Sequence, residues 1–186
     1  HKVGVCEGPS GGGATYILPG LVEAGESSIP VFAITTDVAV PSAGRFPLTE
    51  LDQEALMKPL TKWNKVANTA QGLPTNIRSA FRAMTTGTPG SAHLGLPFDV
   101  QKAAVDPSDV WAQEALGSYP AWPAAPDPKE VERFVGALMT AENPIIICGG
   151  GIIIAQAEAE LQRLAERLDL VIATTVSGQG SLSELH

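Results

Sequence analysis

The chain has few of the residue types that build disulfide frameworks or nucleic-acid surfaces. Only two cysteines occur in 186 residues, Cys6 and Cys148, and each lies within an apolar run. We therefore expect reduced thiols in buried strands rather than a secreted disulfide scaffold, and a cytoplasmic location is the simplest expectation. Twenty acidic residues outnumber twelve basic ones, which gives a net charge of −8. This excess argues against a nucleic acid or an anionic membrane as partner, since both need a positive surface.

Long apolar runs and histidine-rich clusters are also missing. No stretch approaches the roughly 20 apolar residues that span a bilayer, and the N-terminus lacks the order of a signal peptide. Of three histidines, His1 and His186 are terminal, and His93 alternates with apolar residues. A zinc site or a Ser-His-Asp triad therefore has little support. We expect His93 to be a strand residue that faces a loop or a helix.

Glycine, by contrast, is clustered where an apolar run passes into a predicted helix. The stretch GVCEGPSGGGATY, residues 4–16, contains Gly11, Gly12 and Gly13. Glycine tolerates positive φ and lets another group approach the backbone, so this turn suits a ligand-facing main chain. The alternative is a tight strand-to-helix connection without a ligand, which spacing alone favours.

The first part of the chain reads as alternating strands and helices. Apolar or alternating runs predict strands at residues 2–6, 31–36, 60–67 and 92–96, and helical spacing predicts helices at 14–26, 49–57 and 73–84. The acids of the second helix, Glu50, Asp52 and Glu54, are expected on a solvated face. Residues 37–47 are rich in proline and small residues and predict a loop beyond the end of a strand, where open parallel sheets bind ligands.

The second part predicts a βαβ unit after a linker. Residues 102–126 combine proline and alanine with three large aromatic residues, which indicates an interdomain linker that lies against a surface. A helix from Asp127, with a buried stripe at Val131, Val135, Leu138 and Met139, precedes a strand at 145–148, a helix at 157–168 and a strand at 170–175. This second unit is too small for a complete core.

We therefore expect an α/β fold: a three-layer unit with a parallel sheet at residues 1–101, a linker at 102–126, and an incomplete Rossmann-like unit at 127–186. The triplet Gly149, Gly150 and Gly151 follows the first strand of the second unit. It could approach a phosphate at a helix start, but it lacks the full dinucleotide fingerprint, which favours a structural turn.

Several segments carry a family likeness when taken in order. They are GVCEGPSGGGATY with SSIPVFAITTD, LDQEALMKPLTKW, TGTPGSAHLGLPFDVQ, NPIIICGGG and ATTVSGQGSL. Together they resemble the thiamine-diphosphate-dependent enzymes of the acetolactate synthase and 2-oxo acid decarboxylase group. The likeness runs in unbroken order over nearly the whole chain, so it is more specific than any one of its motifs.

The resemblance implies a pyrimidine-binding-type first unit and the start of a central domain. It also implies thiamine diphosphate and Mg as cofactors of the parent enzyme, a 2-oxo acid as substrate, and a homo-oligomer. The family's glutamate at the pyrimidine and its metal-binding motif have no counterpart in this chain, which we expect to be an inactive piece of a longer enzyme. No catalytic residue is assigned to it. In some relatives, FAD or another adenine nucleotide lies near the region of Gly149 to Gly151.

Four residues depart from the family pattern near the expected cofactor and substrate. Gly12 and Tyr16 stand where relatives have proline and asparagine, facing the cofactor pyrimidine together with Gly11 and Gly13. Leu48 and Thr49 stand where acetolactate synthases have a substrate-facing phenylalanine and glutamine, which weakens acetohydroxyacid synthesis and leaves a related decarboxylase, carboligase or acyltransferase open.

A second hypothesis comes from a different class of protein: a stand-alone α/β module that binds a nucleotide or a partner without catalysis. The length of the coding sequence separates the two hypotheses. A reading frame that continues into a diphosphate-binding domain supports the enzyme, whereas ends at His1 and His186 support the module.

Overall fold

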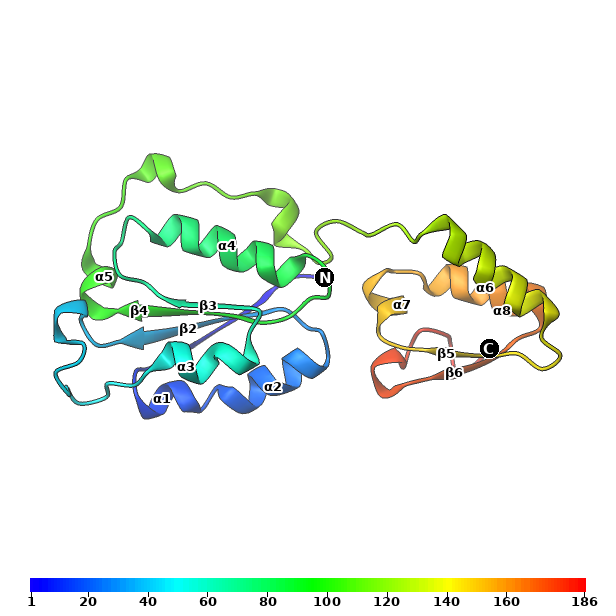
Figure 1. Ribbon diagram of the computed structural model, residues 1–186, viewed down its shortest axis with the longest axis horizontal. Coiled ribbons are helices and arrows are strands. Elements are labelled where there is room, and N and C mark those ends of the chain that lie inside the picture. Colours follow the sequence, from blue (N-terminus) through cyan, green and yellow to red (C-terminus); the bar gives the residue numbers. More distant parts are fainter. The chain divides into compact units, whose positions relative to one another are not determined.

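The computed structural model describes residues 1–186, which form two compact units, His1–Trp122 and Pro123–His186. Figure 1 shows their elements along the chain. None of the helices combines the length and the apolar composition that crossing a membrane requires.

The first unit is built on a four-stranded parallel sheet. Its strands are β1 (Gly4–Gly8), β2 (Val31–Asp37), β3 (Trp63–Val66) and β4 (Ala92–Pro97), in the spatial order β1-β2-β4-β3. The central pair starts at Phe32 opposite Ala92, and both strands are mostly buried. Helices cover both faces of a parallel sheet, so its strands are buried on both sides and appear in the sequence as near-continuous apolar runs.

Helices cover the two faces of this sheet. Helices α1 (Gly12–Thr15), α2 (Leu18–Glu26) and α3 (Gln53–Met57) lie on one face, and α4 (Leu73–Thr85) lies on the other (Figure 1). A short helix, α5 (Phe98–Lys102), follows β4 directly. Two apolar clusters fill the layers: Ala14, Leu21, Ala33 and Met57 under α1 to α3, and Phe32, Ala67, Ala70, Ala80, Met84, Ala92, Leu94 and Val100 under α4. The expected three-layer α/β fold is confirmed.

Four elements differ by two residues or more from the bounds expected from the sequence. The strand expected at residues 60–67 is only Trp63–Val66, because a 3-10 helix takes up Lys58–Leu60. Strand β1 begins two residues late because its pairing with β2 starts at Gly4, while Lys2 forms an isolated bridge to Ser118. The helix expected at residues 14–26 is two helices, and Pro19 lies in the first turn of the second, where its missing N–H costs nothing. Helix α3 starts at Gln53 rather than at residue 49, because Asp52 caps it by accepting a hydrogen bond from the N–H of Ala55 at 3.0 Å.

The segment expected to be a linker belongs mostly to the first unit. Its Leu116 is buried, and the N–H of Ala121 donates to the carbonyl of Thr85 at 2.8 Å. The guanidinium carbon of Arg78 on α4 lies 4.1 Å from the centre of the Trp111 ring. The aromatic residues of this segment therefore hold it against α4, as large rings do when they cover a surface.

The second unit contains α6 (Pro128–Thr140), β5 (Ile145–Cys148), α7 (Gly151–Ile154), α8 (Glu158–Leu168) and β6 (Val171–Thr174). Strands β5 and β6 pair in parallel, which confirms the expected βαβ unit. The buried stripe expected on α6 is wrong, because Val131, Val135 and Met139 are exposed. The buried residues of this small unit come from other elements, namely Cys148, Leu161, Ala165, Gly178 and Ser181.

Candidate functional site

The candidate site lies at the carboxyl-terminal edge of the four-stranded sheet. Three segments leave the ends of neighbouring strands there: the glycine turn after β1, the long loop of residues 38–52 after β2, and α5 after β4. This edge is where open α/β sheets bind ligands, because loops from several strands converge on it.

The glycine turn is packed directly against Thr49 of the long loop. Gly11 has φ +63°, and a Cβ built on it would lie 2.8 Å from the Cβ of Thr49 and 2.9 Å from its Cα. The hydroxyl groups of Ser10 and Thr49 are 2.9 Å apart and share a hydrogen bond. Thr49 itself has φ +75°, a strained conformation for a β-branched residue. Two segments singled out separately in the sequence, the turn and residues 48–49, thus form one structure.

The other two glycines of the turn have different surroundings. A Cβ on Gly13 would lie 2.2 Å from the Cγ of Pro9, so Gly13 is required for the turn to close. A Cβ on Gly12 would have no atom within 4 Å, so this position faces open space. Nearby, the Tyr16 side chain is 84% exposed and the Leu48 side chain 91% exposed. The candidate residues therefore form an open surface with a rigid, closely packed base.

Carboxylate side chains fix the long loop of residues 38–52 by accepting hydrogen bonds from backbone N–H groups. Glu50 accepts hydrogen bonds from the N–H groups of Gly44 and Phe46, and Asp99 at the start of α5 accepts one from Val40 at 3.0 Å. Glu54 accepts one from the N–H of Val66, at the end of β3. Asp52 and Glu54 are exposed, as expected, whereas Glu50 is half-buried, and each of the three acids also accepts a hydrogen bond from the backbone, which the helical pattern did not indicate.

A buried polar network lies under this loop and joins the sheet to α3. Thr35 on β2, Gln53 at the start of α3 and His93 on β4 are all almost fully buried. The Thr35 hydroxyl donates to Oε1 of Gln53, and Nε2 of His93 lies 2.7 Å from the same hydroxyl. Nε2 of Gln53 donates to the carbonyl of Thr36 at 2.8 Å. The first residue of α3 is therefore anchored to the strand that precedes the long loop.

These contacts define the proton positions of the network. Since the Thr35 hydroxyl gives its proton to Gln53, it accepts a hydrogen bond from a protonated Nε2 of His93. Nδ1 of His93 then carries a lone pair, and it has no hydrogen-bond partner. Burial lowers the pKa of His93 to about 4, so the ring is neutral at neutral pH. Burial also raises the pKa of Asp37 at the end of β2, although the N–H of Val38 donates to its carboxylate at 2.7 Å.

His93 was expected to be a strand residue that faces a loop or a helix, and in the structure it lies on β4 and faces the start of α3. Thr35 and Gln53 were not singled out. The available signal was that Thr35 and His93 are polar residues within otherwise apolar strands. Their meeting with Gln53 depends on the register of β2 with β4, which a single sequence does not give.

The second glycine cluster, Gly149 to Gly151, follows β5 and packs against the turn after β6. A Cβ on Gly150 would lie 3.1 Å from the carbonyl oxygen of Ser177, and one on Gly178 only 2.2 Å from the carbonyl oxygen of Cys148. The helix that starts here, α7, has only four residues. Close packing of two turns thus accounts for Gly150, whereas a Cβ on Gly151 would have no atom within 4 Å.

The side chains that could act as metal ligands indicate which part of a cofactor this chain could contact. No group of three or more His, Cys, Asp or Glu side chains is arranged to hold a metal ion. The two cysteines are free thiols, and burial raises the pKa of Cys6. The backbone at Gly12 is open and Tyr16 is exposed, and no ligand cluster for a cation bound to a diphosphate is present at this edge.

Comparison with known families agrees with these observations. Residues 1–56 match the family model described as thiamine pyrophosphate enzyme, N-terminal TPP binding domain, and residues 131–186 match thiamine pyrophosphate enzyme, central domain. The chain belongs to the thiamine pyrophosphate enzyme family. The resemblance seen in the sequence is thus confirmed.

Individual relatives extend the match over the whole chain. The chain is 36% identical to the probable acetolactate synthase large subunit of Methanococcus aeolicus, over 100% of this chain and 31% of the relative. It is 32% identical to the glyoxylate carboligase of Escherichia coli O157:H7, over 100% of this chain and 30% of that protein. The chain therefore spans about a third of the length of the curated relatives it matches.

Proposed function

We propose that the edge formed by Gly11, Gly12, Gly13 and Thr49 receives the aminopyrimidine end of thiamine diphosphate in an enzyme that acts on a 2-oxo acid by decarboxylation or carboligation. The observation that carries this proposal is the open backbone at Gly12 beside the locked contact of Gly11 with Thr49. When bound, the cofactor supplies a thiazolium carbon that attacks the carbonyl carbon of the substrate.

In this proposal, the residues of the chain bind the cofactor and orient it. The turn offers main-chain groups and no bulky side chain, so a ring can approach the backbone at Gly12. Tyr16, 84% exposed, can cover the edge of that ring. The network of Thr35, Gln53 and His93 would keep Leu48 and Thr49 at a constant distance from the turn, because it anchors the helix in which the loop ends.

Leu48 and Thr49 would face the substrate in this arrangement. An apolar side chain and a short hydroxyl would shape the acceptor side, which favours carboligation with an acceptor other than that of acetohydroxyacid synthesis. Magnesium and the diphosphate would be held by residues outside this site, and Gly149 to Gly151 would act as a structural turn rather than as an FAD site.

The exposed apolar side chains at this edge support a homo-oligomer. Tyr16, Leu48 and Phe46 are 84%, 91% and 94% exposed and lie on neighbouring segments of the site. Exposed groups of this kind mark contacts with a partner or a ligand. We propose that a second copy covers them and completes the cofactor site.

The test is a titration of the isotope-labelled chain with thiamine diphosphate, followed by NMR. We expect weak binding that shifts the amide signals of Gly12 and Tyr16 and leaves those of residues 149–151 unchanged. Gly12→Leu fills the open space and abolishes the shifts. Gly20→Leu is the matched control, because Gly20 also has no atom within 4 Å of a built Cβ but lies on α2, away from the turn. Shifts that persist in Gly12→Leu contradict the proposal.

A further inference from the structure

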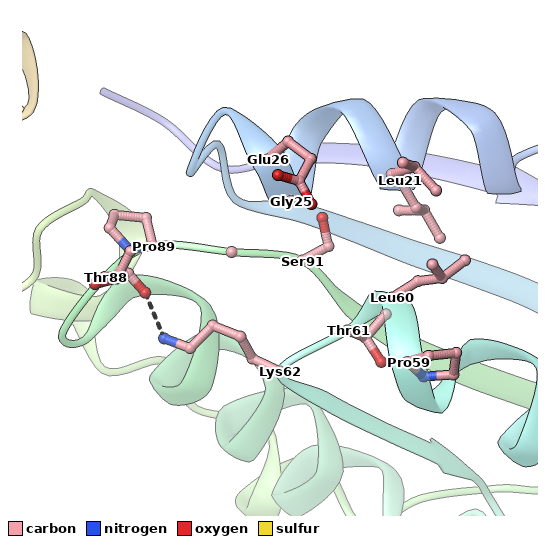
Figure 2. A pocket seen from close by; sticks show the side chains of 12 residues that line it. Leu21, Gly25, Glu26, Pro59, Leu60, Thr61, Lys62, Thr88, Pro89 and Ser91 are labelled. Atoms are coloured by element: carbon pink, nitrogen blue, oxygen red, sulfur yellow. Dashed lines mark hydrogen bonds between the residues drawn. The ribbon is translucent and has the colours of Figure 1, made fainter. Parts of the chain in front are cut away.

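A cavity lies at the amino-terminal edge of the four-stranded sheet, opposite the proposed cofactor site. Its volume is about 450 Å³, within the roughly 300–1,000 Å³ range of small-molecule sites. Three segments enclose it: the end of α2, residues 59–62 before β3, and residues 88–91 before β4. Figure 2 shows the side chains that line it. The proposed cofactor site uses none of these residues.

A lysine without an acidic partner forms one wall of the cavity. Nζ of Lys62 donates to the carbonyl of Thr86 at 2.8 Å and to that of Thr88 at 2.6 Å, and Figure 2 shows the second of these bonds. No carboxylate lies within 4.0 Å of it, since the ion pairs of the chain are formed by other residues. An ammonium group has three protons, so one donor is left for an anion. The stem of Lys62 lies over Gly90, where a built Cβ would come within 2.8 Å of Cδ.

A carboxylate and a buried hydroxyl come from the other walls. Glu26 at the end of α2 has an exposed carboxylate that forms no ion pair. The hydroxyl of Ser91 is buried and has no hydrogen-bond partner. Figure 2 shows it pointing toward Gly25 of α2. A buried hydroxyl without a protein partner is uncommon in native proteins, so Ser91 has a free hydrogen-bonding group that a water molecule or a ligand in the cavity can satisfy.

The remaining lining is largely apolar. It consists of Leu21, Val22, Pro59, Leu60 and Pro89. The cavity therefore presents one free cation, one free anion and an apolar surface on three different segments. A ligand that satisfies all of them carries both charges and a short hydrocarbon group.

We propose that this cavity binds a small zwitterion, an α-amino acid with an apolar side chain. Its carboxylate bonds Lys62, its ammonium group lies toward Glu26, and its side chain contacts Leu21 and Leu60. The Ser91 hydroxyl gains a partner in the bound state. Burial lowers the pKa of Lys62, which an anionic ligand would reverse by favouring the charged form.

The test is isothermal titration calorimetry of the full chain with three matched probes: L-norvaline, pentanoate, which lacks the ammonium group, and butylamine, which lacks the carboxylate. We expect L-norvaline to bind about tenfold or more tightly than either singly charged probe, since one charged hydrogen bond contributes about 1.4 kcal/mol or more. Equal binding of L-norvaline and pentanoate, or no binding of L-norvaline, overturns the proposal.

Two variants test which side chain binds the carboxylate of the ligand and which binds its ammonium group. Lys62→Met keeps the stem over Gly90, and it should weaken binding of L-norvaline about tenfold without changing that of butylamine. Glu26→Gln, at an exposed position that does not endanger folding, should reduce binding of L-norvaline to the level of pentanoate. Lys65→Met on β3 and Glu23→Gln on α2 are matched controls, because neither residue lines the cavity. Variants of Lys62 and Glu26 that bind like these controls contradict the assignment.

Discussion

Alanine at Gly11 should destabilise the first unit far more than alanine at the adjacent Gly12. Gly11 combines φ +63° with ψ −128°, a conformation that residues with a Cβ rarely adopt, and this costs about 1–3 kcal/mol. The new Cβ would also lie 2.8 Å from Thr49, and overpacking of this kind costs about 1–3 kcal/mol. The expected loss for Gly11→Ala is therefore about 2–6 kcal/mol of the free energy of unfolding.

Gly12 provides the internal control for this change. It starts α1, and a Cβ there meets no atom within 4 Å, so Gly12→Ala should be neutral or stabilise by up to about 1 kcal/mol. Urea unfolding followed by tryptophan fluorescence is the assay. All three tryptophans, Trp63, Trp111 and Trp122, belong to the first unit, so the signal reports on that unit alone.

A similar free energy of unfolding for the two alanine variants would refute the reasoning. It would mean that the turn moves away from Thr49 without cost, and hence that the contact between the turn and the loop is not rigid. The proposed cofactor edge would then lose its fixed base. A double variant, Gly11→Ala with Thr49→Gly, should recover part of the loss, because glycine removes the Cβ that the new methyl group meets and tolerates the φ of +75° at position 49.

Two further predictions concern pH and the second unit. The pKa of His93 is about 4 in the folded chain, compared with an ordinary value of 6.5. Between these two pH values the unfolded chain binds a proton that the folded chain does not. The free energy of unfolding should therefore fall by up to about 3 kcal/mol as the pH drops through this range. In His93→Gln, which keeps a donor toward Thr35, urea unfolding measured across this pH window should show a smaller loss. In the second unit, Gly178→Ala should destabilise because its Cβ would lie 2.2 Å from the carbonyl oxygen of Cys148, whereas Gly136→Ala within α6 should stabilise by about 0.5–1 kcal/mol. Circular dichroism of the two variants checks this, and equal midpoints would contradict it.

Much of the fold could be predicted because it depends on local pattern. The continuous apolar run at residues 31–36 and the alternation at residues 92–96 indicated buried strands, and helical spacing with Pro74 in the first turn indicated α4. The start of α3 is set by a local bond, from the N–H of Ala55 to the N-cap Asp52, whereas the bond of Glu54 to the N–H of Val66 depends on the distant strand β3 and could not be predicted. The position of residues 103–122 likewise depends on contacts with α4 that lie far away in the sequence.

For the candidate site, the sequence by itself determined that glycine occupies the turn after β1, but it predicted that Thr49 starts a helix, whereas the structure places Thr49 in the loop before α3. Only the tertiary structure decided that Gly11 is pressed against Thr49, that Gly12 is open, and that Thr35, Gln53 and His93 meet beneath the loop. The physical reason is that residue types and local spacing set backbone preference and burial. Which buried polar groups become partners, by contrast, depends on the order and register of the strands, which arise from contacts between distant parts of the chain.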